Sequence, residues 1–259
     1  MSKFIESLKQ LSEGIPQPIG FRRAEAGVKK PKLQLLVALT GRVTSGQTAS
    51  LDAANAGLIS PEEGTGITDT IQKLSDTVAI PWGVRITGEE AVDTKTLMEA
   101  GVDFIVFPST APLTGLLSKD IGRIIEIDIT IGDTTLRTLN DAPVDAVLIS
   151  RSNPDDKVMT WEDLMGLHRI SGMVKKPAIA QVPSGISREE LQTLWESGID
   201  AVVVEVAGSE GSETLKRLRE NIDRLEYPKA KNEKGLAIAP RVQFTSRPEH
   251  DEEEEEEEE

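Results

Sequence analysis

The chain has 259 residues, contains no cysteine and carries a formal net charge of −15. Without cysteine it cannot form disulfides, thiolate zinc sites, iron–sulfur clusters or a cysteine nucleophile. No segment approaches the roughly 18 consecutive apolar residues of a membrane span, and the polar first residues lack the apolar core of a secretion signal. We therefore expect a cytoplasmic protein that contacts no membrane.

The negative charge is concentrated at the end of the chain, where Asp251 and eight consecutive glutamates supply nine negative charges. Subtracting these nine from the total of −15 leaves −6 for the remainder. A run of like charges repels itself and buries nothing, so we expect a disordered, solubilising tail; an acidic arm that binds a partner is the alternative. Because the body is also acidic and aromatic residues are scarce, we expect no nucleic-acid partner.

Apolar runs alternate with amphipathic segments along most of the chain. Residues 3–12 are predicted as a short helix, and residues 14–32 as an irregular lead-in. Strands are predicted at residues 33–40, 57–60, 78–86, 103–107, 123–129 and 145–150, with two more within 177–225. Helices are predicted at 48–55, 67–75, 89–99, from 108–112 onward, 133–139 and 161–173, with two more within 177–225.

Eight strand–helix units that recur about every 20 to 30 residues predict a single (β/α)8 TIM barrel over residues 33–225. The strands are continuous runs of Val, Ile and Leu, which is typical of parallel strands buried on both faces. An open, doubly wound sheet is the alternative. Residues 1–32 are assigned to the N-terminal helix and lead-in, and residues 226–259 to a C-terminal extension with the acidic tail.

In such barrels the functional site lies where the strands end. Arginines are predicted at three of these ends and offer planar forks of donors suited to phosphate or carboxylate: Arg42, Arg85 and Arg151. In the alternative interpretation each arginine pairs with a rim carboxylate, namely Glu126, Asp128 or Glu205.

Glu126 and Asp128 alternate with isoleucines in the fifth strand, so both carboxylates point to the same face. If that face is the barrel interior, their crowding would raise one pKa, as a general acid or base requires. They are therefore the catalytic candidates, with an ion pair to Arg85 or Arg151 as the structural alternative. Glu205, in the last strand, is a further rim carboxylate.

Other catalytic residue types are missing from the predicted rim. His168 falls within a predicted helix and His250 in the tail, so neither serves there as a base or metal ligand. No lysine occupies a predicted strand end, which argues against an aldolase that forms an imine. We expect no zinc or iron site. A magnesium ion held by one or two of the acids and by a phosphate of the ligand is an alternative.

The segment VPSGISREELQTLWESGIDAVVVEVAG at 182–208 resembles the last two units of the ribulose-phosphate-binding barrel superfamily, and indole-3-glycerol phosphate synthases most closely. The phrase LMEAGVDFIVFPS at 97–109 is similar to the passage from helix three to strand four of the same barrels. The resemblance implies a site for a substrate or flavin phosphate at backbone amides after strand seven, with the second half of the site after strand eight. Ser184, Gly185 and Ile186 match the first half. The second half departs from the motif: either Gly208 and Ser209 supply it from a displaced loop, or the site has changed its ligand.

The chain departs from that family at Glu205, which stands where these barrels have a glycine. The catalytic lysine and glutamate motifs of the synthases also have no counterpart, so their activity is not carried over. Three functions remain: a lyase, isomerase or synthase acting on a small phosphorylated or anionic metabolite, a barrel that binds flavin mononucleotide (FMN), and a barrel without catalysis that serves in binding or assembly. The sequence is compatible both with a monomer and with a homo-oligomer.

Overall fold

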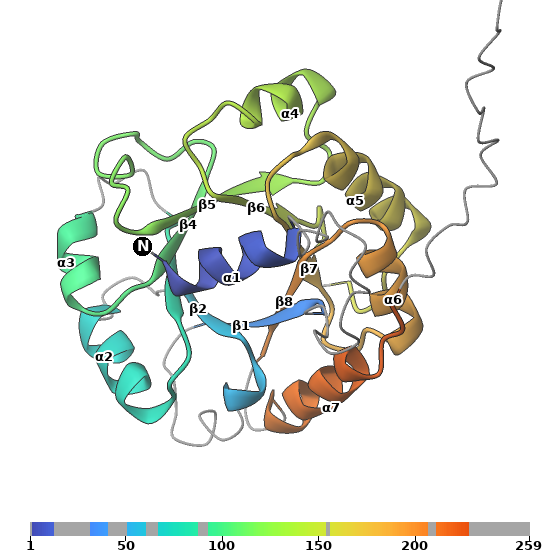
Figure 1. Ribbon diagram of the computed structural model, residues 1–259, viewed down its shortest axis with the longest axis horizontal. Coiled ribbons are helices and arrows are strands. Elements are labelled where there is room, and N and C mark those ends of the chain that lie inside the picture. Colours follow the sequence, from blue (N-terminus) through green and yellow to red (C-terminus); the bar gives the residue numbers. More distant parts are fainter. Residues whose placement is uncertain are drawn as a thin grey trace, which may run out of the picture. The chain divides into compact units, whose positions relative to one another are not determined.

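The computed structural model describes residues 2–12, 32–40, 51–60, 67–87, 93–153, 156–206 and 211–227. Eight parallel strands form a closed barrel in which each strand pairs with the next and β8 pairs with β1 (Figure 1). The strands are β1 Gln34–Thr40, β2 Ala56–Ser60, β3 Trp82–Arg85, β4 Phe104–Pro108, β5 Gly122–Asp128, β6 Ala146–Ser150, β7 Ala178–Val182 and β8 Ala201–Glu205. The predicted (β/α)8 barrel is confirmed, and the open sheet is excluded.

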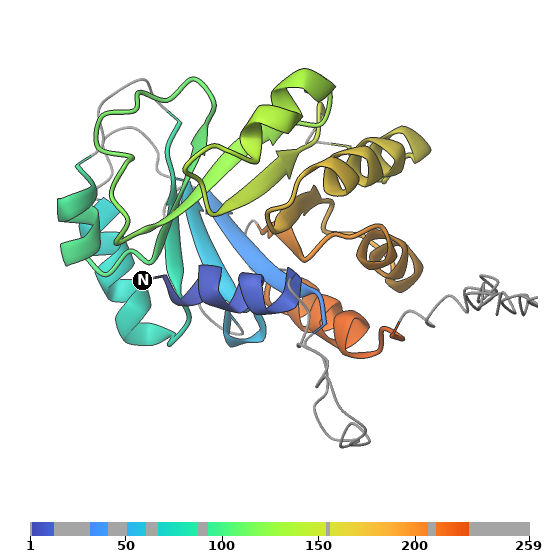
Figure 2. The ribbon, with the colours of Figure 1, turned by 45° about the horizontal axis from the view of Figure 1, so that its top comes forward.

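Most of the helices cover the outside of the barrel (Figures 1 and 2). They are α1 Lys3–Ser12, α2 Ile67–Thr77, α3 Thr94–Glu99, α4 Asp133–Leu139, α5 Trp161–Met173, α6 Arg188–Glu196 and α7 Gly211–Asp223, with a short 3-10 turn, η1, at Leu51–Ala53. None of these helices is long and apolar enough to cross a membrane. Residues 1–226 form one compact unit; the acidic tail lies outside the described residues.

Four predicted elements differ from the structure. The helix expected at 89–99 begins at Thr94, after the N-cap residue Asp93. The connection from β4 to β5 was expected to contain a helix but consists of turns, with Pro112 near its start and Gly115 in the left-handed region at φ 84°. The helix expected at 48–55 is, in its described part, only the turn η1. Strand β3 begins at Trp82, later than expected, because Pro81 has no N–H to donate to a neighbouring strand.

Alternation along the strands divides the buried side chains into two layers. One set lies between the strands and the outer helices, and the other fills the barrel interior. Phe104 is fully buried in the interior, and its ring contacts Phe4 with a centroid distance of 4.8 Å. Gly83 makes room for this ring, since a Cβ atom there would lie 2.2 Å from Phe104.

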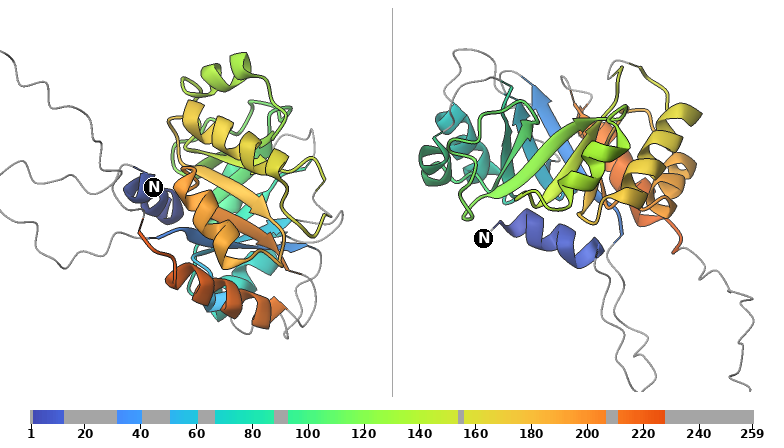
Figure 3. Two further views of the ribbon diagram at one scale, coloured as in Figure 1. Left: turned by 90° about the vertical axis from the view of Figure 1, so that its right-hand side faces the viewer. Right: turned by 90° about the horizontal axis from the view of Figure 1, so that it is seen from above.

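Helix α1 closes the end of the barrel at which the strands begin (Figure 3). Its apolar residues, including Phe4, are buried in the interior cluster. Asp103, just before β4, caps the helix by accepting hydrogen bonds from the Ser2 hydroxyl at 2.7 Å and from the backbone N–H groups of Lys3 at 2.8 Å and Phe4 at 3.0 Å. The predicted N-terminal helix is thus confirmed. Because it covers the end at which the strands begin, a ligand site in the barrel is expected at the opposite end, where the strands finish.

Candidate functional site

Polar side chains replace apolar ones where the barrel interior reaches the carboxyl ends of the strands. Arg85, the last residue of β3, forms a bidentate ion pair with Glu126 of β5: Nε donates a hydrogen bond to Oε2 at 2.9 Å, and Nη2 donates one to Oε1. The two side chains are only 17% and 16% exposed. Glu126 projects inward, since Ile124 belongs to the interior layer and Ile127 to the outer layer. The ion pair foreseen as the structural alternative is therefore present.

Glu205, the last residue of β8, joins the same network. Its Oε1 lies 3.6 Å from Arg85 Nη1 and accepts a hydrogen bond of 3.4 Å from Gln181 Nε2. The hydrogen bond to Glu126 raises the pKa of Arg85; burial opposes this rise, and the negative charges of Glu126 and Glu205 add to it. One guanidinium thus faces two carboxylates, and Glu205, with a side chain 50% exposed, is the more accessible of the two.

Asp128 has partners of its own. It accepts hydrogen bonds from the backbone N–H of Thr130 at 2.7 Å and from the Thr130 hydroxyl at 2.5 Å, and it is exposed. Alternation places Asp128 on the same side of β5 as Glu126, as predicted. The described contacts nevertheless do not bring the two carboxylates together.

Arg151 is buried beneath the loop between β6 and α5. Its guanidinium donates to the carbonyl oxygens of Asp156 and Val158, both at 2.8 Å, and to Asp163 Oδ2 at 3.3 Å. These partners differ from those of Arg85, so the two arginines do not form one anion site in the described part. Arg42, the third predicted arginine, lies outside the described residues.

The turn after β7 lies at the same end of the barrel. Ser184 and Gly185 are exposed, whereas Ile186 is buried and donates its backbone N–H to the Pro183 carbonyl at 3.1 Å. Helix α6 then begins with a capping box, in which Ser187 Oγ accepts from the Glu190 N–H and the Glu190 carboxylate accepts from the Ser187 N–H. Within the described ranges, the amides of Ser184 and Gly185 have no protein partner.

Two residues at this end of the barrel were not predicted as site residues from the sequence. Arg217 of α7 donates from Nη2 to the Ser184 carbonyl oxygen at 2.7 Å and brings a positive charge to the turn. Gln181 accepts from the Arg151 N–H at 3.4 Å and connects it to Glu205. Gln181 carried a signal, because it is a polar residue on an otherwise apolar strand; Arg217 is 33 residues from its partner and carried none.

The second half of the predicted phosphate site, Gly208 and Ser209, lies outside the described residues. Among the residues that are described, no three histidine, aspartate or glutamate side chains are grouped as a metal site would need. Of the acids at the barrel mouth, Glu126 is paired with Arg85, and Glu205 contacts both Arg85 and Gln181.

The structure resembles two solved barrels from Pyrococcus furiosus. A mutant tryptophan synthase alpha-subunit matches with a TM-score of 0.57 and 15% identity, covering 75% of this chain and 98% of that one. Thiamine phosphate pyrophosphorylase matches with a TM-score of 0.52 and 13% identity, covering 73% of this chain and 96% of that one. No protein-family model matches the sequence, and a search of curated proteins gave no match.

Identities this low show the fold alone. The protein is a (β/α)8 barrel, and its candidate site lies at the carboxyl ends of the strands. The barrel fold that the resemblance implied is confirmed.

Proposed function

We propose that the protein binds a small phosphorylated or otherwise anionic metabolite at the carboxyl ends of its strands and acts on it as a lyase, isomerase or synthase. The observation that carries this proposal is the exposed Ser184–Gly185 turn, whose amides have no partner in the described ranges and beside which Arg217 lies. Free amides before a helix, together with an arginine, attract a phosphate group. The names of the two similar barrels support this proposal, since one is a tryptophan synthase subunit and the other a thiamine phosphate pyrophosphorylase.

In this proposal the phosphate occupies the turn and the rest of the ligand reaches the barrel mouth. Strands β7 and β8 are neighbours, with Val182 in register with Val204, so Glu205 lies on the strand beside the turn. Glu126 and Asp128 are the proposed acid–base groups. Arg85 holds the Glu126 carboxylate in a fixed orientation inside the barrel mouth. Arg42, Gly208 and Ser209 are proposed as further anion contacts, whereas Arg151 supports the loop.

Thermal unfolding with a panel of phosphate compounds tests the proposal. A ligand at about ten times its dissociation constant stabilises the folded protein by about 1.4 kcal/mol, which for a chain of this size raises the Tm by about 3 to 6 °C. Gly185→Asp should abolish the shift, because it adds a negative charge to the turn. Gly185→Ala is the matched control, because the nearest atom to a new Cβ, the Lys157 carbonyl oxygen, is 3.9 Å away. An unchanged melting curve across the panel would contradict the proposal.

An FMN-binding barrel would use the same turn for the flavin phosphate, and it predicts visible flavin absorbance after FMN is added and the free flavin removed. The binding or assembly barrel without catalysis is favoured by one observation, the engagement of Glu126 by Arg85. Under that interpretation, Glu126→Gln and Asp128→Asn would leave the cellular phenotype intact while deletion of the acidic tail would remove it. Under the enzyme proposal, either substitution at the mouth lowers turnover of a compound found in the panel.

A further inference from the structure

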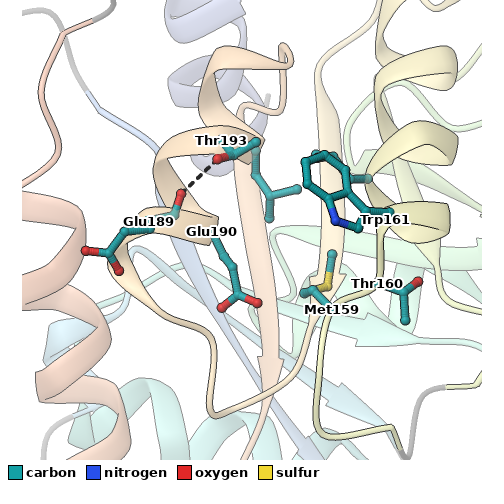
Figure 4. A pocket seen from close by; sticks show the side chains of 8 residues that line it. Met159, Thr160, Trp161, Glu189, Glu190 and Thr193 are labelled. Atoms are coloured by element: carbon teal, nitrogen blue, oxygen red, sulfur yellow. Dashed lines mark hydrogen bonds between the residues drawn. The ribbon is translucent and has the colours of Figure 1, made fainter.

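A groove separate from the barrel mouth lies on the outer surface, between the first turns of α5 and α6. It has a volume of about 290 Å³. Its apolar floor is formed in part by Leu164 and Leu194, and Figure 4 shows Trp161 on one side and Glu190 on the other. Met159 lies between them in the same view. The hollow therefore combines an aromatic ring, a thioether and a carboxylate within the reach of one long side chain.

Trp161 is exposed to an unusual degree for the largest apolar side chain. It is the first residue of α5 and is 78% exposed, and the neighbouring Val158 and Met165 are 66% and 64% exposed. The opposite face of the helix supplies the core residues Leu167 and Ile170. An apolar ridge that a folded chain leaves uncovered beside a hollow is typical of a surface that receives a partner.

The charge of the groove indicates which chemical group of a partner it would bind. Glu190 Oε2 accepts the Ser187 N–H at 2.7 Å, while Oε1 has no partner in the described part of the chain. Glu189 also lines the groove, and no described residue bonds to its carboxylate. The adjacent cation, Arg188, is paired with Glu226 at 3.5 Å. The groove is thus an aromatic surface bordered by the Glu190 carboxylate, and Figure 4 shows the Glu189 carboxylate directed away from Trp161.

We propose that this groove receives an arginine side chain presented by a partner protein. The guanidinium stacks on the Trp161 indole and donates to Glu190 Oε1, while the methylene stem lies on Met159 and Leu164. Arginine fits better than lysine, because its planar group stacks on a ring and donates to a carboxylate at the same time. Val158 and Met165 then contact apolar residues that flank the arginine. A second copy of this chain is a poorer occupant, because each copy carries a net charge of −15.

The first test uses two small probes of the same shape, N-acetyl-arginine amide and N-acetyl-citrulline amide. Citrulline has a neutral urea in place of the guanidinium. In heteronuclear NMR spectra of the full chain, the arginine probe should shift the Trp161 indole N–H signal in a saturable way, while the buried Trp82 signal stays in place. The citrulline probe should bind about tenfold more weakly, the loss expected for one cation–aromatic contact with its charged hydrogen bond. Equal effects of both probes, or no saturable shift, would overturn the proposal.

Variants locate the binding site. Glu190→Gln retains an acceptor for the Ser187 N–H but removes the charge, and it should weaken the arginine probe about fivefold or more. Trp161→Leu should do the same, now followed through backbone signals of α6. Glu196→Gln, at the far end of α6, is the matched control and should bind as the wild type does. Binding that survives both Trp161→Leu and Glu190→Gln, or a dimer in sedimentation that Trp161→Leu dissociates, would refute an arginine-bearing partner.

Discussion

Asp200 lies between α6 and β8, at the end of the barrel closed by α1, and it provides the sharpest test of the electrostatics of this fold. Its carboxylate accepts the Ala178 N–H at 2.9 Å. Within the described ranges no lysine or arginine forms an ion pair with it. Burial raises the pKa of Asp200 from 3.8 to about 6, and the hydrogen bond from Ala178 only partly opposes this rise.

The raised pKa makes stability depend on pH in a defined direction. The folded protein binds a proton at Asp200 more tightly than the unfolded chain does, so this contribution is complete below about pH 4 and is lost as the pH rises through about 6. A difference of about two pKa units corresponds to about 3 kcal/mol. Because Asp200 is only partly buried overall, we expect about 1 to 2 kcal/mol.

Asp200→Asn removes the charge and keeps an oxygen for the Ala178 N–H. We expect the variant to match the wild type near pH 3 and to exceed its free energy of unfolding by about 1 to 2 kcal/mol at pH 7.5. Urea unfolding at several pH values measures this difference, with the exposed Asp120→Asn as a control that should show no such trend. A difference that is constant with pH, or a variant less stable than the wild type at pH 7.5, would refute the reasoning.

Two further predictions concern the ends of the barrel. Arg85→Met leaves Glu126 without its bidentate partner and should cost about 3 kcal/mol in urea unfolding, whereas Arg85→Met with Glu126→Leu should recover most of that loss. Equal losses in both variants would mean that the pair is not coupled. Asp103→Ala removes the cap of α1 and should cost about 1 to 2 kcal/mol, with faster hydrogen exchange in α1 than in the strands. Uniform acceleration over the barrel would instead indicate global destabilisation.

Local patterns predicted many elements well where the chain carries its own boundary signals. Helices α4 and α5 have the bounds expected, and α5 begins with a capping box in which Thr160 and Asp163 exchange hydrogen bonds. The prediction of a helix between β4 and β5 was wrong, because two prolines and a glycine with positive φ oppose a helix in that connection. The short η1 shows the same limit, since a strand–helix count cannot say how much helix each unit contains.

The partners within the candidate site could not be obtained in the same way. Arg85 and Glu126 are 41 residues apart, and Arg217 and Ser184 are 33 apart. The sequence placed Arg85, Glu126 and Glu205 near the rim, but it left open whether each arginine faces a ligand or a carboxylate. Closure of the barrel decided this question for Arg85 by directing it and Glu126 into the same interior.

The sequence by itself determined the alternation of strands and helices and the parallel barrel, because these depend on local periodicity and on the handed geometry of successive units. It also located the turn at Ser184 and Gly185. Only the tertiary structure decided that Arg217 stands beside this turn and that Trp161 borders an acidic groove. These outcomes depend on contacts between residues distant in the chain, and no local pattern encodes such contacts.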